Sequence, residues 1–245
     1  MAACGRACTD VCSLLFALQS VKGAPVLLAA NRDESYDRAA TGPRLLSADP
    51  RALAPIDQRA GGTWLGVNEH GLVVAIANRE GGPEGERSRG QLVRDVLATD
   101  TADEARTYLA SLLAEHRYAG FHLLMIDPKE AFYVTWDGEV DGCELASGVH
   151  VLDNSGLDEA ADIPREIRAD LDPEPGEDAD GWLARAISHL TDHEAGLCHH
   201  GDEYGTVSTS AVAIRLDGGA TIELGHASEP ACEADLEWMA LDSHL

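Results

Sequence analysis

Two apolar runs of similar length, Cys12–Gln19 ("CSLLFALQ") and Pro25–Asp33 ("PVLLAANRD"), flank the short glycine-containing stretch "SVKGA". Runs of this kind on either side of a glycine turn are typical of a buried β-hairpin. If the turn centres on Lys22 and Gly23, Cys12 lies opposite Asp33. The hairpin therefore predicts a thiol close to the charged end of the second strand.

That second strand ends on a cluster of polar residues, Asn31-Arg32-Asp33-Glu34. Such residues at the end of a buried strand are costly unless an interaction uses them. Two later apolar runs also end on a polar residue, "TWLGVNEHGLVVAIAN" on Asn78 and "VHVLDN" on Asn154. We therefore expect a site where these strand ends and Cys12 meet.

The remaining pattern alternates strands with amphipathic helices. Residues 91–116 read as one or two helices, with Thr101 and Glu104 spaced as a capping box. Residues 166–194 are acidic and helical around a Pro/Gly break, and strands at 207–216 and 220–224 end the pattern. No repeat or long linker divides the chain. This order predicts a single α+β domain over residues 12–245 with mostly antiparallel sheets.

The charge balance restricts the partners of the chain. Its 245 residues contain 43 Asp and Glu against 18 Lys and Arg, a formal net charge of −25. Such a chain repels phosphate backbones and anionic lipid surfaces, so we expect neither nucleic acid nor membrane as a partner. A small-molecule substrate or ligand is expected instead. Adaptation to high salt is an equally good reason for the acidic surface.

Six scattered cysteines without a Cys-x-x-Cys pair make a disulfide framework improbable and favour a reducing compartment. The apolar stretch Val11–Leu18 is too short for a signal peptide core with basic flanks or for a membrane span. We therefore expect a cytoplasmic protein without a membrane span. The oligomeric state does not follow from the sequence.

Each candidate residue also has a plain structural interpretation. An unpaired cysteine in a strand is usually a small buried hydrophobic residue, but Arg32 beside Cys12 would favour the reactive thiolate. Arg32 and Asp33 could form a structural ion pair, and Asn78 and Asn154 could satisfy loop backbone groups. Taken singly, these alternatives remain open.

Taken together, five motifs resemble one family: "NRDE" after a strand hairpin that begins with Cys12, "AGGTWLGVNEHGLVVAIAN", "GERSRG", "VHVLDNSGLD" and "HGDEYGTVSTS". The sequence resembles the NRDE family, also called the transport and Golgi organisation protein 2 family, from Cys12 to about Cys232. That family is similar to N-terminal nucleophile (Ntn) hydrolases of the choloylglycine hydrolase and penicillin V acylase type. The resemblance implies a four-layer αββα sandwich and cleavage of amides by an N-terminal cysteine.

The resemblance also implies which residues act. It places the catalytic residues at five positions: Cys12, Arg32, Asp33, Asn78 and Asn154. Asn31, Glu34 and Trp64 are expected to bind substrate, and neither a metal nor a cofactor is expected. The Arg and Asp of the acylases are spaced differently from the adjacent Arg32 and Asp33.

A cysteine that is both nucleophile and chain terminus carries its own base, because a free α-amine has a pKa of about 7.7 to 8.0 and the thiol about 8.5. In this mechanism Asp33 holds the ammonium and Arg32 orients Asp33 or the substrate. Asn78 and Asn154 donate to the developing oxyanion, and losing one such donor typically costs roughly 3 to 4 kcal/mol.

The extension at residues 1–11, "MAACGRACTDV", would remove that free amine. Three explanations compete: a true start at Val11 with the initiator Met removed, a pro-segment released by self-cleavage, or loss of the mechanism. We favour the first, because the extension has no pattern of its own. Cys4, Cys8 and Cys12 match no common metal motif.

A second departure lies in "GTVSTS", where Val207 stands at a position at which family members commonly have Arg. If that arginine binds substrate anions or supports the site, this chain has lost the interaction or takes a different substrate.

Two function classes follow from the residues and the resemblance. The first is a cysteine amidohydrolase acting on a small acyl amide. The alternative is a non-enzymatic protein that binds or transports haem, lipid or acyl-coenzyme A. For haem, "GLCHHGDEYG" offers Cys198, His199 and His200 as ligands, although adjacent histidines point apart and no further ligand is spaced nearby.

Overall fold

The computed structural model describes residues 12–46, 49–79 and 81–245. The extension at residues 1–11 therefore lies outside the described residues. Two antiparallel sheets form the centre of the molecule. The first sheet has six strands in the order β10-β1-β2-β11-β12-β13. Their bounds are β1 Leu14–Val21, β2 Ala24–Ser35, β10 Gly148–Leu152, β11 Tyr204–Arg215, β12 Thr221–Ala227 and β13 Glu237–Leu241.

The second sheet has seven strands in the order β3-β4-β5-β6-β7-β8-β9, which is also their order along the chain. Each strand thus pairs with the next, as in an antiparallel meander, although the chain forms the two helices of residues 89–115 between β6 and β7. The bounds are β3 Ala40–Leu46, β4 Ala52–Asp57, β5 Leu65–Asn68, β6 Val73–Asn78, β7 Phe121–Ile126, β8 Ala131–Trp136 and β9 Val140–Glu144.

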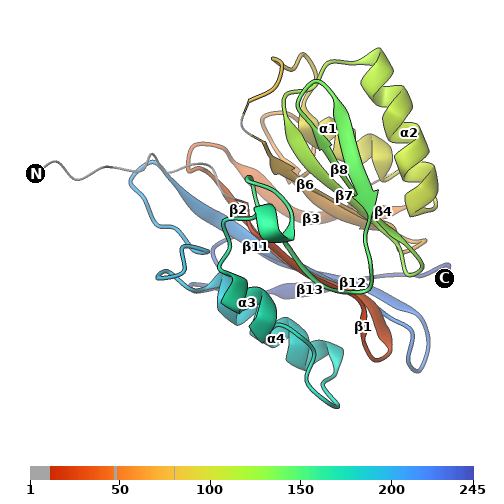
Figure 1. The fold of residues 1–245 in the computed structure, drawn as a ribbon, viewed down its shortest axis with the longest axis vertical. Coiled ribbons are helices and arrows are strands. Elements are labelled where there is room, and N and C mark those ends of the chain that lie inside the picture. Colours follow the sequence, from red (N-terminus) through yellow and green to blue (C-terminus); the bar gives the residue numbers. More distant parts are fainter. Residues whose placement is uncertain (1–11, 47–48, 80) are drawn as a thin grey trace, which may run out of the picture.

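Helices cover the outer face of each sheet (Figure 1). They are α1 Arg89–Val96, α2 Ala102–Glu115, α3 Arg165–Asp170 and α4 Ala179–Leu190, with a 3₁₀ turn at Asp158–Ala160. The first two pack on the seven-stranded sheet through a core that includes Leu92, Leu109 and Leu123. The other two pack on the six-stranded sheet through a core around Trp182, Leu27 and Ala211.

A third core lies between the two sheets and joins them face to face. It contains Phe16 and Leu28 from the six-stranded sheet and Val67, Ala75 and Leu124 from the seven-stranded one, all fully buried. Burial on both faces explains why the central strands read as continuous apolar runs rather than as alternating ones. The layers are helices, sheet, sheet and helices, so the expected α+β fold with antiparallel sheets in four layers is confirmed.

The first hairpin forms as the sequence predicts, but with a register offset by one residue. Leu14 pairs with Ala30, so Ser13 aligns with Asn31, whose backbone N–H donates to the Ser13 carbonyl at 2.9 Å. The offset arises at an irregularity between Leu18 and Val21, where Gln19 has a φ of 48°. Cys12 therefore faces Arg32 rather than Asp33, although both lie beside it.

Four strands do not stand out in the sequence pattern: β3, β4, β9 and β13. Proline lies within the first two, at Pro43 and Pro55, and proline lowers the strand signal. Every residue of β9 and four of the five in β13 are exposed, so neither carries an apolar run. These strands form because neighbouring strands supply their hydrogen-bond partners.

The pairing of β2 with β11 contains a bulge at the residue that departs from the family pattern. Thr206 pairs with Asp33 and Ser208 with Arg32, which leaves Val207 as the extra residue. A bulge re-aims the side chains next to it. The bulge therefore lies directly across from the two charged residues that the sequence analysis singled out.

The capping box at the start of α2 forms in part. Thr101 accepts a hydrogen bond from the Glu104 backbone at 3.2 Å, whereas the Glu104 carboxylate accepts from Asp100 rather than from Thr101. The longest described helix, α2, has 14 residues, and no described helix is long and apolar enough to cross a membrane.

Candidate functional site

The ends of strands from both sheets meet around a cavity of about 330 Å³, called here the Cys12 cavity. Six of the eight residues that the sequence analysis proposed line it: Cys12, Arg32, Asp33, Glu34, Trp64 and Asn78. They come from the segment just before β1, the end of β2, the residue before β5 and the end of β6. The antiparallel topology thus gathers at one edge residues that are far apart in the sequence.

Asn154, the seventh, contacts Cys12 directly. Its Oδ1 accepts a hydrogen bond from the Cys12 backbone N–H at 3.3 Å. The Asn154 carbonyl is 3.2 Å from His122 Nε2, and the Tyr133 hydroxyl is 2.7 Å from His122 Nδ1. Burial lowers the pKa of His122, so the ring is neutral and can donate to Asn154 and accept from Tyr133. The seven-stranded sheet thereby holds Asn154 in place next to Cys12.

The Cys12 thiol is strongly held in its neutral form. Burial and the Asp33 carboxylate raise its pKa to about 12, against the opposing effects of a hydrogen bond from the Asp33 backbone and of the Arg32 charge. Arg32 does favour the thiolate, as the sequence analysis argued, but burial and Asp33 outweigh its effect on the pKa. With Cys12 inside the chain, the site has an inert thiol.

Arg32 is buried and held on three sides. Its Nη2 lies 3.1 Å from Asp57 Oδ2 and 3.6 Å from Glu34 Oε2, and its guanidinium carbon lies 4.4 Å from the centre of the Trp64 ring. A guanidinium over an aromatic face gains cation–π attraction. These contacts fix the planar group at the cavity wall.

Arg38 joins this network from the turn after β2. Its Nε is 2.6 Å from Asp57 Oδ2 and its Nη1 is 3.0 Å from Glu34 Oε2. The carboxylates of Glu34 and Asp57 each pair with both Arg32 and Arg38, so two negative charges balance two positive ones. A buried network of this kind persists only when each charge has such partners.

Asp33 lies on the side of β2 that faces β11 and the loop that precedes β11. Its Oδ1 accepts from the Thr206 hydroxyl at 2.6 Å, and the same hydroxyl accepts from the His199 backbone at 3.0 Å. The carboxylate is buried and oriented next to Cys12. It lies where a positively charged group on Cys12 would be stabilised.

Asn31 is placed differently from the other proposed residues. Its Nδ2 donates to the Leu190 and Leu197 carbonyls at 2.8 and 2.7 Å, and its Oδ1 accepts from Thr209 at 2.7 Å. These bonds tie β2 to the end of α4. Asn31 does not line the Cys12 cavity, so it holds a helix in place rather than contacting this space.

A second cavity of about 430 Å³, the Val207 cavity, adjoins the first and shares Arg32 and Arg38 with it. Val207 and His226 form part of its wall. Burial and the neighbouring Arg32 lower the pKa of His226 to about 4, so this imidazole is neutral near pH 7. Val207 brings no charge to this wall, where Arg32 and Arg38 supply the positive charge.

Sequence reasoning missed Asp57, Arg38 and His122. Asp57 ends the apolar strand "ALAPID", which is the same signal that marked Asn78, but Pro55 concealed the strand. Arg38 follows a turn and carries no pattern. His122 lies inside an apolar run, and only the pairing of β7 with β6 and β8 shows which neighbours it meets.

Two groups of described residues could hold a metal ion, and neither lies in the Cys12 cavity. One consists of Glu69, His70 and His244; the other of His193, Cys198, His200 and Cys232. The prediction that Cys198 and His200 have no further ligand nearby is therefore wrong, because the fold brings His193 and Cys232 close to them. His199 is not a member of either group.

The sequence matches the family model described as "Transport and Golgi organisation 2" over residues 11–174. A relative from Bos taurus, "Transport and Golgi organization protein 2 homolog", is 27% identical over 236 residues, which cover 80% of this chain and 84% of the relative. The protein of the same name from Homo sapiens is 33% identical over 145 residues, 54% of this chain and 51% of the relative.

Three solved structures share the fold. Penicillin V acylase from Agrobacterium tumefaciens superposes with a TM-score of 0.62 at 14% identity, over 95% of this chain and 88% of that one. The C2A mutant of conjugated bile acid hydrolase from Clostridium perfringens gives 0.54 at 12% identity, over 94% and 92%. The Caenorhabditis elegans ortholog of N-acylethanolamine-hydrolyzing acid amidase gives 0.54 at 12%, over 81% and 91%. The expected Ntn-hydrolase-like fold is confirmed.

Proposed function

This chain belongs to the Transport and Golgi organisation 2 family, and from that premise and the geometry around Cys12 we propose that it is a cysteine amidohydrolase acting on a small acyl amide. One observation carries the proposal: Cys12 lies at a cavity wall with its backbone nitrogen 3.3 Å from Asn154 Oδ1, and with Asp33 and Arg32 beside it. The names of the structural neighbours, which include an acylase, a hydrolase and an amidase, agree with this reaction class.

The nucleophile of the proposed reaction is the Cys12 sulfur, activated by its own α-amine. A free amine would take the thiol proton, and the thiolate would attack the amide carbonyl carbon. Within the chain, the nitrogen of Cys12 is an amide and the thiol has a pKa of about 12. The proposal therefore requires a form that begins at Cys12, either by initiation at Val11 with Met removal or by cleavage after Val11.

Each neighbour of Cys12 would stabilise one of the charges that form during this reaction. Asp33 stabilises the ammonium, and the Asn154 and Asn78 amides donate to the oxyanion of the tetrahedral intermediate. Collapse of the intermediate breaks the carbon–nitrogen bond, and the ammonium proton passes to the leaving amine. Water then hydrolyses the thioester to the acid and regenerates Cys12.

The charge of the cavity wall bears on the substrate. Five arginines line the Cys12 cavity, namely Arg32, Arg38, Arg59, Arg87 and Arg89, against the three acidic residues Asp33, Glu34 and Asp57. This is a local excess of positive charge in a chain with a net charge of −25. Arginine pairs well with carboxylates. We therefore propose that the acyl amide carries a carboxylate group.

The test compares two forms of the protein, residues 1–245 and residues 12–245 with a free Cys12 amine, each verified by intact mass. Both are incubated with paired amides that differ only in a carboxylate, with liberated amine as the readout. The form beginning at Cys12 should hydrolyse the anionic member faster, and the longer form should be inactive. The intact mass of the natural protein should also begin at Cys12.

Two variants of the shorter form serve as controls. Cys12→Ala should abolish turnover. Asn154→Asp keeps the Oδ1 acceptor for Cys12 but loses the amide donor, so kcat should fall roughly 100- to 1000-fold. Unchanged turnover in Cys12→Ala would refute the proposal. Binding of the amides without any turnover by the shorter form would favour the carrier alternative.

A further inference from the structure

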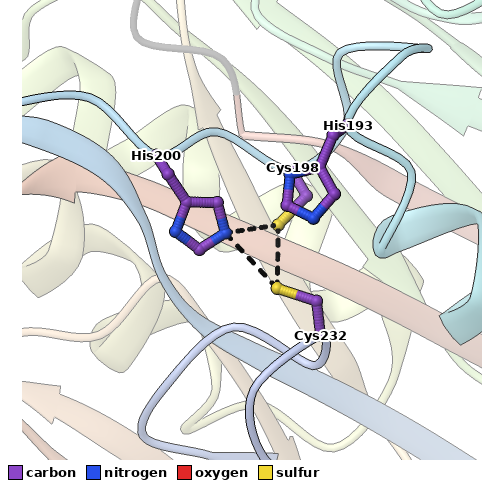
Figure 2. Close-up of side chains that lie close together, drawn as sticks. All are labelled: His193, Cys198, His200 and Cys232. Atoms are coloured by element: carbon purple, nitrogen blue, oxygen red, sulfur yellow. Dashed lines mark hydrogen bonds between the residues drawn. The ribbon is translucent and has the colours of Figure 1, made fainter.

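Four side chains that commonly bind transition metals lie together outside the Cys12 cavity: His193, Cys198, His200 and Cys232 (Figure 2). One nitrogen or sulfur atom of each lies within 4.8 Å of those of the others. Three come from the segment between α4 and β11, and Cys232 comes from the loop between β12 and β13. We propose that these four residues bind one Zn²⁺ ion.

The distances within the cluster match a tetrahedral zinc site. Zinc–sulfur bonds of about 2.3 Å and zinc–nitrogen bonds of about 2.0 Å place two sulfurs about 3.8 Å apart and a sulfur and a nitrogen about 3.5 Å apart. Cys198 Sγ lies 3.5 Å from Cys232 Sγ, and His200 Nε2 lies 3.5 and 3.3 Å from the two sulfurs. These three ligand atoms need shifts of only a few tenths of an ångström, and the His193 nitrogen, which lies within 4.8 Å of them, would move in as the fourth ligand.

The second nitrogen of His200 has a partner of the kind that metal-binding histidines use. His200 Nδ1 lies 3.5 Å from Glu233 Oε1, while Nε2 faces the two thiols. A carboxylate at Nδ1 holds the proton there and leaves Nε2 free as a ligand. Glu233 would thus act as a positioning residue that orients the ring toward the ion.

The ligand set favours zinc over the two other uses of such residues. A disulfide between Cys198 and Cys232 would need a sulfur–sulfur distance of about 2.05 Å instead of 3.5 Å, and it would give the two imidazoles no role. A haem fills four of the positions around iron with its own nitrogens, so four convergent protein ligands suit a bare ion. Two thiolates and two imidazoles in a closed tetrahedron are typical of structural zinc.

Binding needs no oxidant and leaves the charges balanced. When no cation is present, the two thiols lie 3.5 Å apart, a distance at which one can donate a hydrogen bond to the other. When Zn²⁺ binds, each thiol releases its proton to solvent and forms a sulfur–zinc bond.

The ion would fasten two loops that border the Val207 cavity. His200 and Glu233 both line that cavity, which shares Arg32 with the Cys12 cavity. The backbone of the same segment also orients Thr206, because the His199 N–H donates to its hydroxyl. The zinc site would therefore stabilise the wall beside the candidate catalytic residues without taking part in the reaction.

The test uses the untagged full chain purified without chelator. Elemental analysis should find one zinc per chain. Exchange for Co²⁺ should give the intense visible bands of tetrahedral cobalt together with thiolate-to-cobalt charge-transfer bands. Removal of the ion with a chelator should lower the thermal unfolding midpoint, and adding zinc back should restore it.

Matched variants separate this site from adventitious binding. Cys232→Ser and His200→Ala should lose the bound metal and the charge-transfer bands. Cys143→Ser removes another exposed cysteine, and His199→Ala removes the neighbouring histidine, so both should keep one zinc per chain. Glu233→Gln should keep the tetrahedral spectrum but weaken affinity roughly 10- to 100-fold.

Circular dichroism of each variant shows whether loss of metal reflects loss of the fold, and the wild-type cobalt spectrum tests the ligand set without any variant. Absence of zinc with octahedral, thiolate-free cobalt spectra would overturn the proposal. A Cys198–Cys232 disulfide in the freshly purified protein, found by mass after thiol alkylation, would overturn it as well. Equal metal loss in the His199→Ala and His200→Ala variants would also contradict it.

Discussion

At the scale of single residues, the candidate site is a set of buried charges that depend on one another. Asp57 illustrates this, since it accepts hydrogen bonds from Arg32 at 3.1 Å, from Arg38 at 2.6 Å and from the Ala60 backbone at 2.7 Å. Arg32 is almost fully buried, and burial lowers its pKa against the effects of Glu34 and Asp57. Removing one carboxylate would leave a buried positive charge short of a partner.

We therefore expect Asp57→Asn to destabilise the fold by about 3 kcal/mol, because breaking a buried ion pair from one side leaves its partner uncompensated. Asp137→Asn is the matched control, since Asp137 pairs with Arg79 at 2.6 Å but is 40% exposed. An exposed pair contributes at most about 1 kcal/mol. Urea unfolding of both variants measures the difference, and equal destabilisation would contradict the buried-charge interpretation.

His226 gives a dependence on pH at the same scale. Its pKa is lowered to about 4 by burial and by Arg32, whereas an unfolded histidine titrates near 6.5. The unfolded chain therefore takes up a proton between about pH 6.5 and 4 that the native chain does not. The stabilising contribution is fully present above pH 6.5 and is lost as the pH falls through this window.

His226→Gln should remove this contribution. Between about pH 7.5 and 5, the free energy of unfolding of the natural sequence should fall by about 2 kcal/mol more than that of the variant. Glutamine can keep the contact with Ser210, which lies 2.9 Å from His226 Nδ1. Unfolding curves of both proteins at the two pH values give the four free energies of unfolding from which this difference is calculated. Parallel losses in both proteins would show that other groups cause the acid sensitivity.

At the scale of elements, the sequence predicts strands where apolar runs are continuous. It predicts β1, β2, β5 and β6 because these strands are buried on both faces. It does not predict β3, which is mostly half-buried and contains Pro43, or β9, which is fully exposed. The order of both comes from pairing with β4 and β8. The register of β1 on β2 depends on the conformation of Gln19, which no local pattern specifies.

The same limit applies to the candidate site. The polar residues at the ends of apolar strands predicted Cys12, Arg32, Asp33 and Asn78 as site residues, because local hairpins bring them to the edge of the sheets at the Cys12 cavity. This strand-end pattern also marked Asn154, but its direct contact with Cys12 depends on the pairing of β10 with β1, which are separated by more than a hundred residues. The sequence offered Cys198 and His200 as ligands, but it could not predict the full cluster, because Cys232 joins it through the tertiary arrangement of two loops.

The contact between the β4–β5 connection and α1 offers a test of element packing. A Cβ on Gly62 would lie 2.2 Å from the Gly90 carbonyl carbon, and the Thr63 N–H donates to the Gly90 carbonyl at 3.0 Å. Gly62→Ala must push the start of α1 away from the sheet. We expect a loss of about 2 to 3 kcal/mol in unfolding free energy.

Gly42→Ala is the control, because its Cβ would meet its nearest neighbour at an ordinary 3.7 Å. That substitution should be nearly neutral or slightly stabilising, since alanine has less conformational entropy to lose. Thermal unfolding followed by circular dichroism compares the two variants. Tolerance of Gly62→Ala would show that α1 does not rest on this connection.

At the scale of the whole molecule, two opposing electrostatic effects act on stability. Exposed ion pairs such as Arg106–Asp103 and Arg165–Glu159 attract. Against them, 43 acidic residues face only 18 basic ones, so even complete pairing would leave an excess of 25 negative charges. Each exposed pair contributes at most about 1 kcal/mol and acts locally, whereas the unpaired charges repel over the whole surface.

Repulsion should therefore win at low ionic strength, and screening should stabilise the fold. Raising NaCl from about 0.01 M to about 0.3 M shortens the screening length from roughly 30 Å to under 10 Å. We expect the thermal unfolding midpoint to rise by about 4 °C or more, the shift that corresponds to 1 to 2 kcal/mol for a chain of this size. Scanning calorimetry across this range provides the measurement, with sucrose at matched osmolality as the uncharged control. A midpoint that stays level or falls with salt would mean that the surface ion pairs outweigh the net charge.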